Sequence, residues 1–170
     1  MKKGNVVYLP NSKKFNGVLI VLREPRSEKE GVECIKENKE WFEKIAKGEE
    51  LCQKEKMYYN RMSEMLKACG EENLSDAAFT NIRLSGGSEN ASKEYWKINN
   101  KEQIIKEIVE TVNPKYVFVL KEIFNIVSAK YMDKVQEGLK YGNKVLRKVE
   151  VEGIEYYEIY HPAYRRKINI

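Results

Sequence analysis

The chain has 170 residues, a length typical of one domain, and 42% of them are hydrophobic, which excludes an intrinsically disordered protein. Its formal net charge of +5 permits a polyanionic partner such as nucleic acid but does not require one. The three cysteines, Cys34, Cys52 and Cys69, form no C-x-x-C pair and have no histidine nearby, so we expect neither a metal site nor another cofactor.

The sequence has no feature of an exported or membrane protein. The residues after Met1 contain no long apolar stretch of the kind found in signal peptides. No apolar run approaches the ~18 residues that cross a bilayer. An odd number of cysteines also fits a reducing compartment. We therefore expect a cytoplasmic monomer without a membrane partner.

Two apolar stretches near the N-terminus are typical of strands. Residues 6–9 form a short one that ends at Pro10. Residues 17–22 are apolar without polar alternation, as in a strand that is buried on both faces. The polar residues 23–27 end this second strand.

Two helices are predicted next. Residues 28–48 are charged and predict a helix, or a helix with a loop, because they carry one apolar stripe that includes Trp41, Phe42 and Ile45. Residues 54–69 place Met and Tyr side chains at helical spacing, and Gly70 follows directly, as glycine often does at a helix end. We expect this Met and Tyr stripe to belong to the core.

The remaining chain alternates between strands and helices. Strands are predicted over residues 76–82 and 116–120, with a loop over residues 85–88 after the first. A helix between them begins at Asn99 or Asn100 and ends at Asn113. Another helix covers residues 123–131, and the alternating residues 145–160 predict a hairpin that turns at residues 152–153.

This order of elements predicts an α/β fold. Strands that alternate with helices form a mainly parallel sheet with right-handed crossovers, and the helices cover both of its faces. We expect a single domain over residues 1–170, built as a three-layer α/β/α sandwich around a short four-stranded central sheet.

Polar residues of three types follow the predicted strands. Glu24 follows the first buried strand, Asn81 ends the second, and His161, the single histidine, follows the last. Each has an ordinary explanation as a turn, loop-bonding or structural residue. Ligands of open α/β sheets, however, bind beyond the carboxyl ends of the strands, where these three residues would converge.

At these positions the chain resembles the uracil-DNA glycosylase-like superfamily. Residues 23–26, Arg-Glu-Pro-Arg, resemble its first motif, in which an acid or amide directly precedes a proline. Residues 79–83 resemble the strand that carries its base-reading asparagine, and residues 160–163, Tyr-His-Pro-Ala, resemble its last motif. Residues 113–120 resemble its third strand, so the resemblance covers about residues 17–167.

The resemblance implies a DNA glycosylase that flips out uracil or another damaged base and hydrolyses its N-glycosidic bond. Glu24 would polarise a water or stabilise the cationic sugar, and His161 would donate to the base oxygen on which negative charge grows. Asn81 would read the base edge. The backbone after Pro25, at Arg26, would contact a second base oxygen.

The same resemblance implies contacts with the DNA around the base. The candidate stacking residues are Trp41, Phe42 and Tyr58. The candidate phosphate contacts include Arg26 and a basic C-terminal cluster of Arg165, Arg166 and Lys167, which would make binding depend on salt.

Two other functions stay open. A catalytically degenerate relative would bind nucleic acid without cleaving it, and the arginines on either side of Glu24, Arg23 and Arg26, favour this alternative because they suit phosphate better than an apolar base pocket. A small-molecule-binding α/β domain is the third possibility, although the chain contains no glycine-rich phosphate-binding motif.

Overall fold

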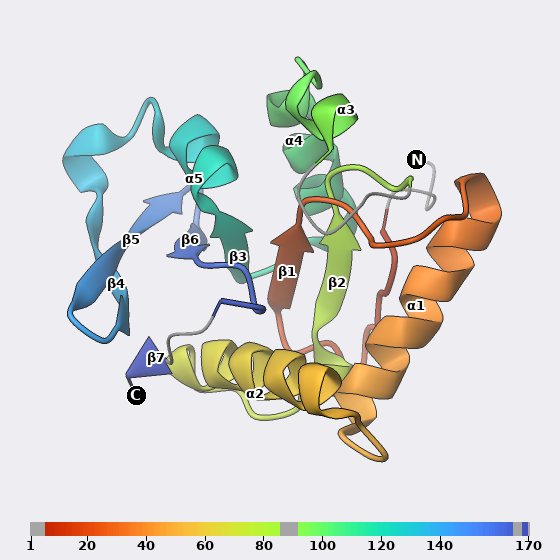
Figure 1. Cartoon of the computed structure of the whole chain (residues 1–170). Helices are drawn as coiled ribbons and strands as arrows, with labels where there is room; N and C mark the ends of the chain where they lie inside the picture. Colours follow the sequence, from red (N-terminus) through yellow and green to blue (C-terminus); the bar gives the residue numbers. More distant parts are fainter. Residues whose placement is uncertain (1–5, 86–91, 165–167, 170) are drawn as a thin grey trace.

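The computed structural model describes residues 6–85, 92–164 and 168–169, and it has an α/β fold with one mixed sheet (Figure 1). The strand order is β2-β1-β3-β6-β5-β4-β7. The four parallel neighbours are β2 (Ala78–Asn81), β1 (Val18–Leu22), β3 (Tyr116–Leu120) and β6 (Ile154–Ile159). The antiparallel strands are β5 (Lys144–Val151), β4 (Gln136–Tyr141) and β7 (Ile168–Asn169).

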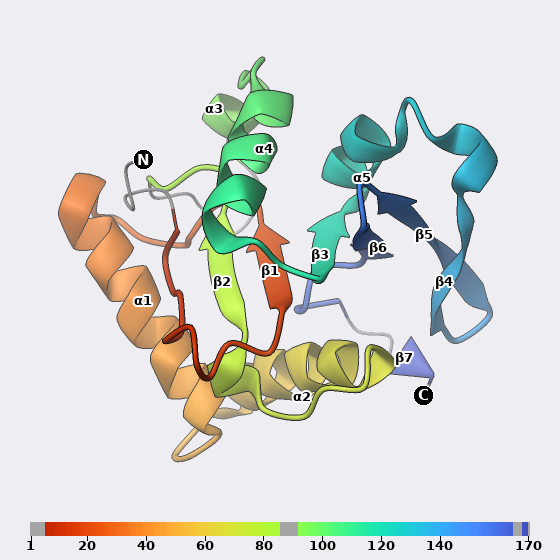
Figure 2. The same ribbon diagram turned by 180° about the vertical axis from the view of Figure 1, so that it is seen from behind.

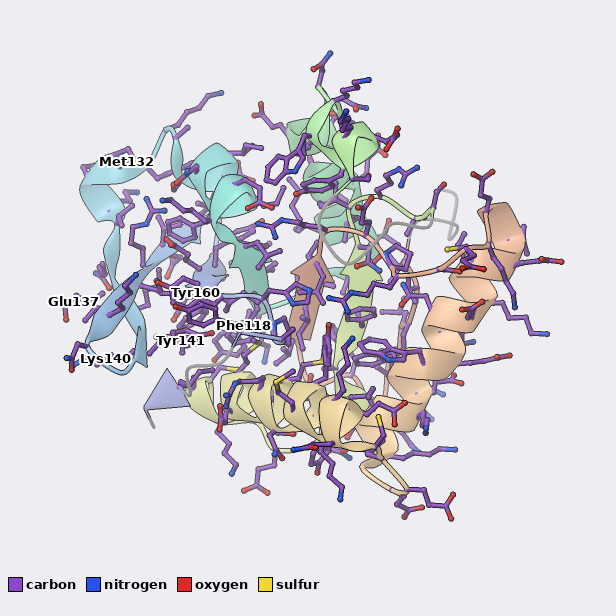
Figure 3. All side chains as sticks on the ribbon, in the orientation of Figure 1. Phe118, Met132, Glu137, Lys140, Tyr141 and Tyr160 are labelled. Atoms are coloured by element: carbon purple, nitrogen blue, oxygen red, sulfur yellow. The ribbon has the colours of Figure 1, made fainter. Side chains whose placement is uncertain are left out.

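The α/β class was predicted correctly, but the four-stranded sheet was too small. Strand β4 was missed because its sequence is mostly polar, and only Leu139 and Tyr141 of it enter the core. Glu137 and Lys140 of the same strand point away from the core, whereas Tyr141 lies close to Tyr160 (Figure 3). Residues 6–9 form no strand of the sheet, and Tyr8 makes a single bridge to Phe79.

Helices lie on both faces of the sheet. Helices α1 (Gly31–Lys47) and α2 (Gln53–Ala68) cover one face (Figure 1). Helices α4 (Lys101–Val112) and α5 (Lys121–Ser128), with the short α3 (Lys93–Trp96), cover the other, which faces the viewer in Figure 2. Two short 3-10 helices, Leu74–Asp76 and Met132–Lys134, lie in connecting segments.

Strand β1 supplies side chains to both cores. No residue of β1 is more than 5% exposed. Val18, Ile20 and Leu22 pack with α1 and α2, whereas Leu19 and Val21 pack with α4 and α5. Successive side chains of a strand point to opposite faces, which is why an unbroken apolar run forms a central strand here.

The carboxyl end of β1 is tied to the end of β2 and to the start of α5. The pairing with β2 continues beyond the strands, because Arg83 N–H donates to the Arg23 carbonyl at 2.9 Å. The Arg23 guanidinium donates two hydrogen bonds, of 2.6 and 3.2 Å, to the carboxylate of Glu122 at the start of α5. These contacts hold the loop after β1 in place at the edge of the sheet where the candidate site lies.

None of the helices in the described part of the chain is long and apolar enough to cross a bilayer.

Candidate functional site

A pocket of about 640 Å³ opens at the carboxyl ends of β1 and β2, on the face that α1 and α2 cover. Five segments line it, namely the loop after β1, helix α1, the start of α2, the end of β2 and the residues after β6. Glu24, Asn81 and His161 all lie in its wall. The three polar residues that follow separate strands in the sequence therefore meet at one pocket.

Asn81 is the most deeply buried polar residue of this wall. Only 2% of it is exposed, and it stands opposite Leu22 in the parallel pairing of β1 and β2. Its side-chain NH₂ group has no hydrogen-bond partner among the described residues. Leaving such a donor unsatisfied costs about 1–3 kcal/mol. The nitrogen of this group is enclosed by protein atoms.

His161 follows β6 and is held as a neutral donor. Its Nδ1 accepts a hydrogen bond from the Ala163 N–H at 3.1 Å, which leaves the ring proton on Nε2. Burial, reinforced by the positive charges of Arg23 and Arg26, lowers the pKa of His161 to about 4 despite the opposing charge of Glu122. The imidazole is therefore uncharged near neutral pH, and it can offer one N–H without carrying a cation into the pocket.

Glu24 lines the pocket, but its carboxylate is held by the loop on its other side. The Ser92 N–H and Oγ–H donate to the two carboxylate oxygens at 2.6 and 2.8 Å, and Arg83 forms an ion pair with Glu24 at 3.0 Å. Only 4% of the Glu24 side chain is exposed. Three of the roughly four lone-pair sites of the carboxylate are thus engaged. The predicted role of Glu24 in activating water stays a prediction, and its visible role is to anchor the start of α3.

Pro25 and Arg26, the other residues of the first motif, also lie in the pocket wall. Pro25 is buried, whereas Arg26 is exposed at the rim. Arg26 therefore adds a positive charge to the outer part of the pocket wall.

Two of the three predicted stacking residues line the pocket. The Trp41 and Tyr58 rings meet edge to face with centroids 5.1 Å apart, and both belong to the wall. Phe42 does not line the pocket, since it is 0% exposed and stacks on Phe79 in the core with centroids 4.5 Å apart. Phe79, which the sequence did not single out, reaches the pocket instead.

The predicted phosphate contacts Arg165, Arg166 and Lys167 lie outside the described residues.

Asn38 is a pocket residue that the sequence reading missed. It lies on the buried stripe of α1 between Cys34 and Phe42, and it is 8% exposed. Its NH₂ group, like that of Asn81, has no partner in the described part of the chain. A polar residue at a core-facing helical position was the available signal, because such positions are normally apolar.

No protein-family model matches the chain, and no curated protein matches it.

Proposed function

We propose that this protein is a uracil-DNA glycosylase-like protein that receives one flipped nucleobase in the pocket and hydrolyses its N-glycosidic bond. The observation that carries the proposal is that Asn81 and His161, from segments far apart in the chain, line one aromatic-walled pocket beside the first-motif loop, where the Nε2–H of His161 is a hydrogen-bond donor. A nucleobase matches this chemistry because it combines a flat ring for stacking with acceptors along its edge.

The neutral imidazole suits the chemistry of bond cleavage. When the N-glycosidic bond breaks, negative charge develops on the leaving base and positive charge on the sugar. A donated Nε2–H of His161 stabilises the oxygen of the base as that charge grows. Asn81 holds the edge of the base, and Trp41 or Tyr58 provides an aromatic surface for its ring.

Glu24 would act through its charge rather than as a proton acceptor. Its oxygens are occupied by Ser92 and Arg83, so a water molecule has little access to a free lone pair. The buried negative charge would still favour a cationic sugar nearby, although Arg83 partly offsets it. Hydrolysis by this arrangement would therefore depend mainly on stabilising the departing base.

The second candidate function is nucleic-acid binding without cleavage, and the contacts of Glu24 favour it. A carboxylate that is mostly engaged by Arg83 and Ser92 is expected in a relative that has kept base recognition and lost water activation. Both functions share the same pocket and the same partner, DNA, and they differ only in whether the bond breaks.

The experiment that separates the two functions is a base-release assay on single-stranded and duplex DNA with one uracil or another deaminated base. Glycosylase activity predicts alkali-labile sites, with a loss of roughly 100-fold or more for His161→Ala. Asn60→Leu is the matched control, because Asn60 is exposed on α2 and lies outside the pocket.

Absence of base release at high protein concentration, on every lesion, would rule out the hydrolase. Binding that weakens steeply with added salt would then support the second candidate. Binding that is indifferent both to salt and to Asn81→Leu would refute base recognition in this pocket.

A further inference from the structure

Trp96 is a large aromatic side chain that the fold leaves exposed near the pocket. It ends α3, which lies beyond the arrowheads of β1 and β2 in Figure 1. Trp96 is 52% exposed and lies outside the pocket wall, whereas its neighbour Tyr95 is 0% exposed and packs in the core with α4 and α5. The core therefore uses Tyr95 and gives no reason for a second large ring at this position.

Two residues of the first-motif loop hold α3 beside the pocket. Glu24, in the pocket wall, accepts hydrogen bonds from the N–H and Oγ–H of Ser92, the residue that caps α3. The guanidinium carbon of Arg23 lies 5.3 Å from the centroid of the Trp96 ring, and Arg23 also belongs to the pocket wall. Because both contacts start from the loop that lines the pocket, the Trp96 ring has a fixed place next to the pocket.

The segment around Trp96 is positively charged. Residues 92–101 contain three lysines and one glutamate. The ammonium group of Lys101 lies 5.9 Å from the centroid of the Trp96 ring. Arg23 supplies a further cation, although its ion pair with Glu122 at 2.6 Å offsets part of that charge. Exposed aromatic rings with cations beside them suit single-stranded nucleic acid, because a base stacks on the ring while the cations attract the phosphates.

We propose that Trp96 is a stacking platform for an unpaired base of single-stranded DNA, next to the nucleotide that the pocket holds. This inference rests on the proposed function for the identity of the ligand, and it adds the state of the strand. A base within a duplex already stacks on its neighbours and would have to leave that stack before it could lie on the indole, whereas an unpaired base is free to do so. The lysines of residues 92–101 then lie where the phosphates of the same strand pass.

The test measures, by fluorescence anisotropy, the binding of wild type, Trp96→Leu and Trp96→Phe to one uracil-containing DNA sequence in single-stranded and in duplex form. The uracil nucleotide carries a 2′-fluorine, which disfavours a cationic sugar and so prevents cleavage during the measurement. Leucine keeps an apolar side chain against Tyr95 but removes the flat ring, whereas phenylalanine keeps a ring. We expect Trp96→Leu to bind the single strand about tenfold more weakly, Trp96→Phe to retain most of the affinity, and the duplex affinity to change much less.

Met132→Ala is the matched control, because Met132 is also an exposed apolar residue, at 59%, and lies outside the pocket wall. It should leave both affinities unchanged. Free deoxyuridine occupies only the pocket, so Trp96→Leu should bind it as tightly as wild type does. An equal loss of affinity for deoxyuridine and for the single strand would mean that Trp96 shapes the pocket, which overturns the platform. A change of oligomeric state in Trp96→Leu without a change in DNA affinity would assign the ring to a protein interface instead.

Base release separates failure of this inference from failure of the proposed function. If Trp96→Leu binds the single strand as tightly as wild type, and wild type releases uracil, the platform is refuted and the proposed function stands. If the platform is confirmed but wild type releases no base, the inference stands with the second candidate function. If wild type binds no single-stranded DNA, both fail. Should Trp96→Leu not fold, Trp96→Gln gives the same readouts, because it removes the ring and suits an exposed position.

Discussion

The pH dependence of stability should report the burial of His161. A pKa of about 4 in the folded protein, against an ordinary value of 6.5, means that the folded state binds this proton less readily than the unfolded state. The resulting stabilisation is complete above about pH 6.5, the unfolded pKa, and it is lost as the pH falls toward the folded pKa. The lowering of the His161 pKa from 6.5 to about 4 corresponds to about 3 kcal/mol of unfolding free energy.

The assay is urea unfolding of wild type and His161→Gln between about pH 7 and pH 4. Glutamine does not titrate, so the two proteins share every other ionisable group and differ only in the histidine contribution. The unfolding free energy of wild type should fall more than that of the variant, by about 3 kcal/mol over this range.

The chain has a single histidine, which makes an independent measurement simple. One imidazole signal in an NMR titration should have its midpoint near pH 4. Its nitrogen shifts should show the proton on Nε2, since Nδ1 accepts from the Ala163 N–H. A midpoint at or above the ordinary 6.5, or equal pH dependence of wild type and His161→Gln, would refute the neutral donor and with it the proposed role of His161.

Two further predictions concern the stability of the fold, one beside the pocket and one in the antiparallel part of the sheet. Arg83→Met should lower the unfolding free energy by about 2 kcal/mol, because it leaves the carboxylate of Glu24 buried without its cation. The control is Lys29→Met, which breaks the exposed ion pair between Lys29 and Glu37 and should leave the urea midpoint unchanged. An equal midpoint for wild type and Arg83→Met would show that the ion pair between Arg83 and Glu24 does not stabilise the fold. Gly138→Ala should cost about 1–3 kcal/mol in the same assay, because a Cβ atom there would lie 2.8 Å from the carbonyl oxygen of Arg147 in the neighbouring strand. An unchanged midpoint would mean that β4 and β5 separate at little cost.

Most of the regular elements could be predicted from local patterns. The apolar runs of β1 and β3 are buried, and α2 ends before Gly70, which has φ of 79°. The turn of the hairpin between β5 and β6 is formed by Glu152 and Gly153, both with positive φ. Such features depend on neighbouring residues alone, because backbone preference and side-chain periodicity act over a few positions.

The extent of the sheet could not be predicted in this way. Strand β4 pairs with β5 and β7 through backbone N–H and C=O groups, and only proline lacks the N–H. The side chains of β4 are mostly polar. Two-residue β7 has too few residues for any periodicity. Local composition therefore gave no signal for these strands, and only the assembled sheet defines them.

The sequence by itself determined which polar residues stand at the ends of strands, and this was enough to bring Glu24, Asn81 and His161 to one pocket. Only the tertiary structure decided what these groups contact. The carboxylate of Glu24 binds Arg83 and Ser92, which are 59 and 68 positions away in the sequence. The NH₂ group of Asn38 has no hydrogen-bond partner among the described residues. The physical reason is that strand order positions backbones, whereas hydrogen bonding and burial depend on side chains that distant segments bring together.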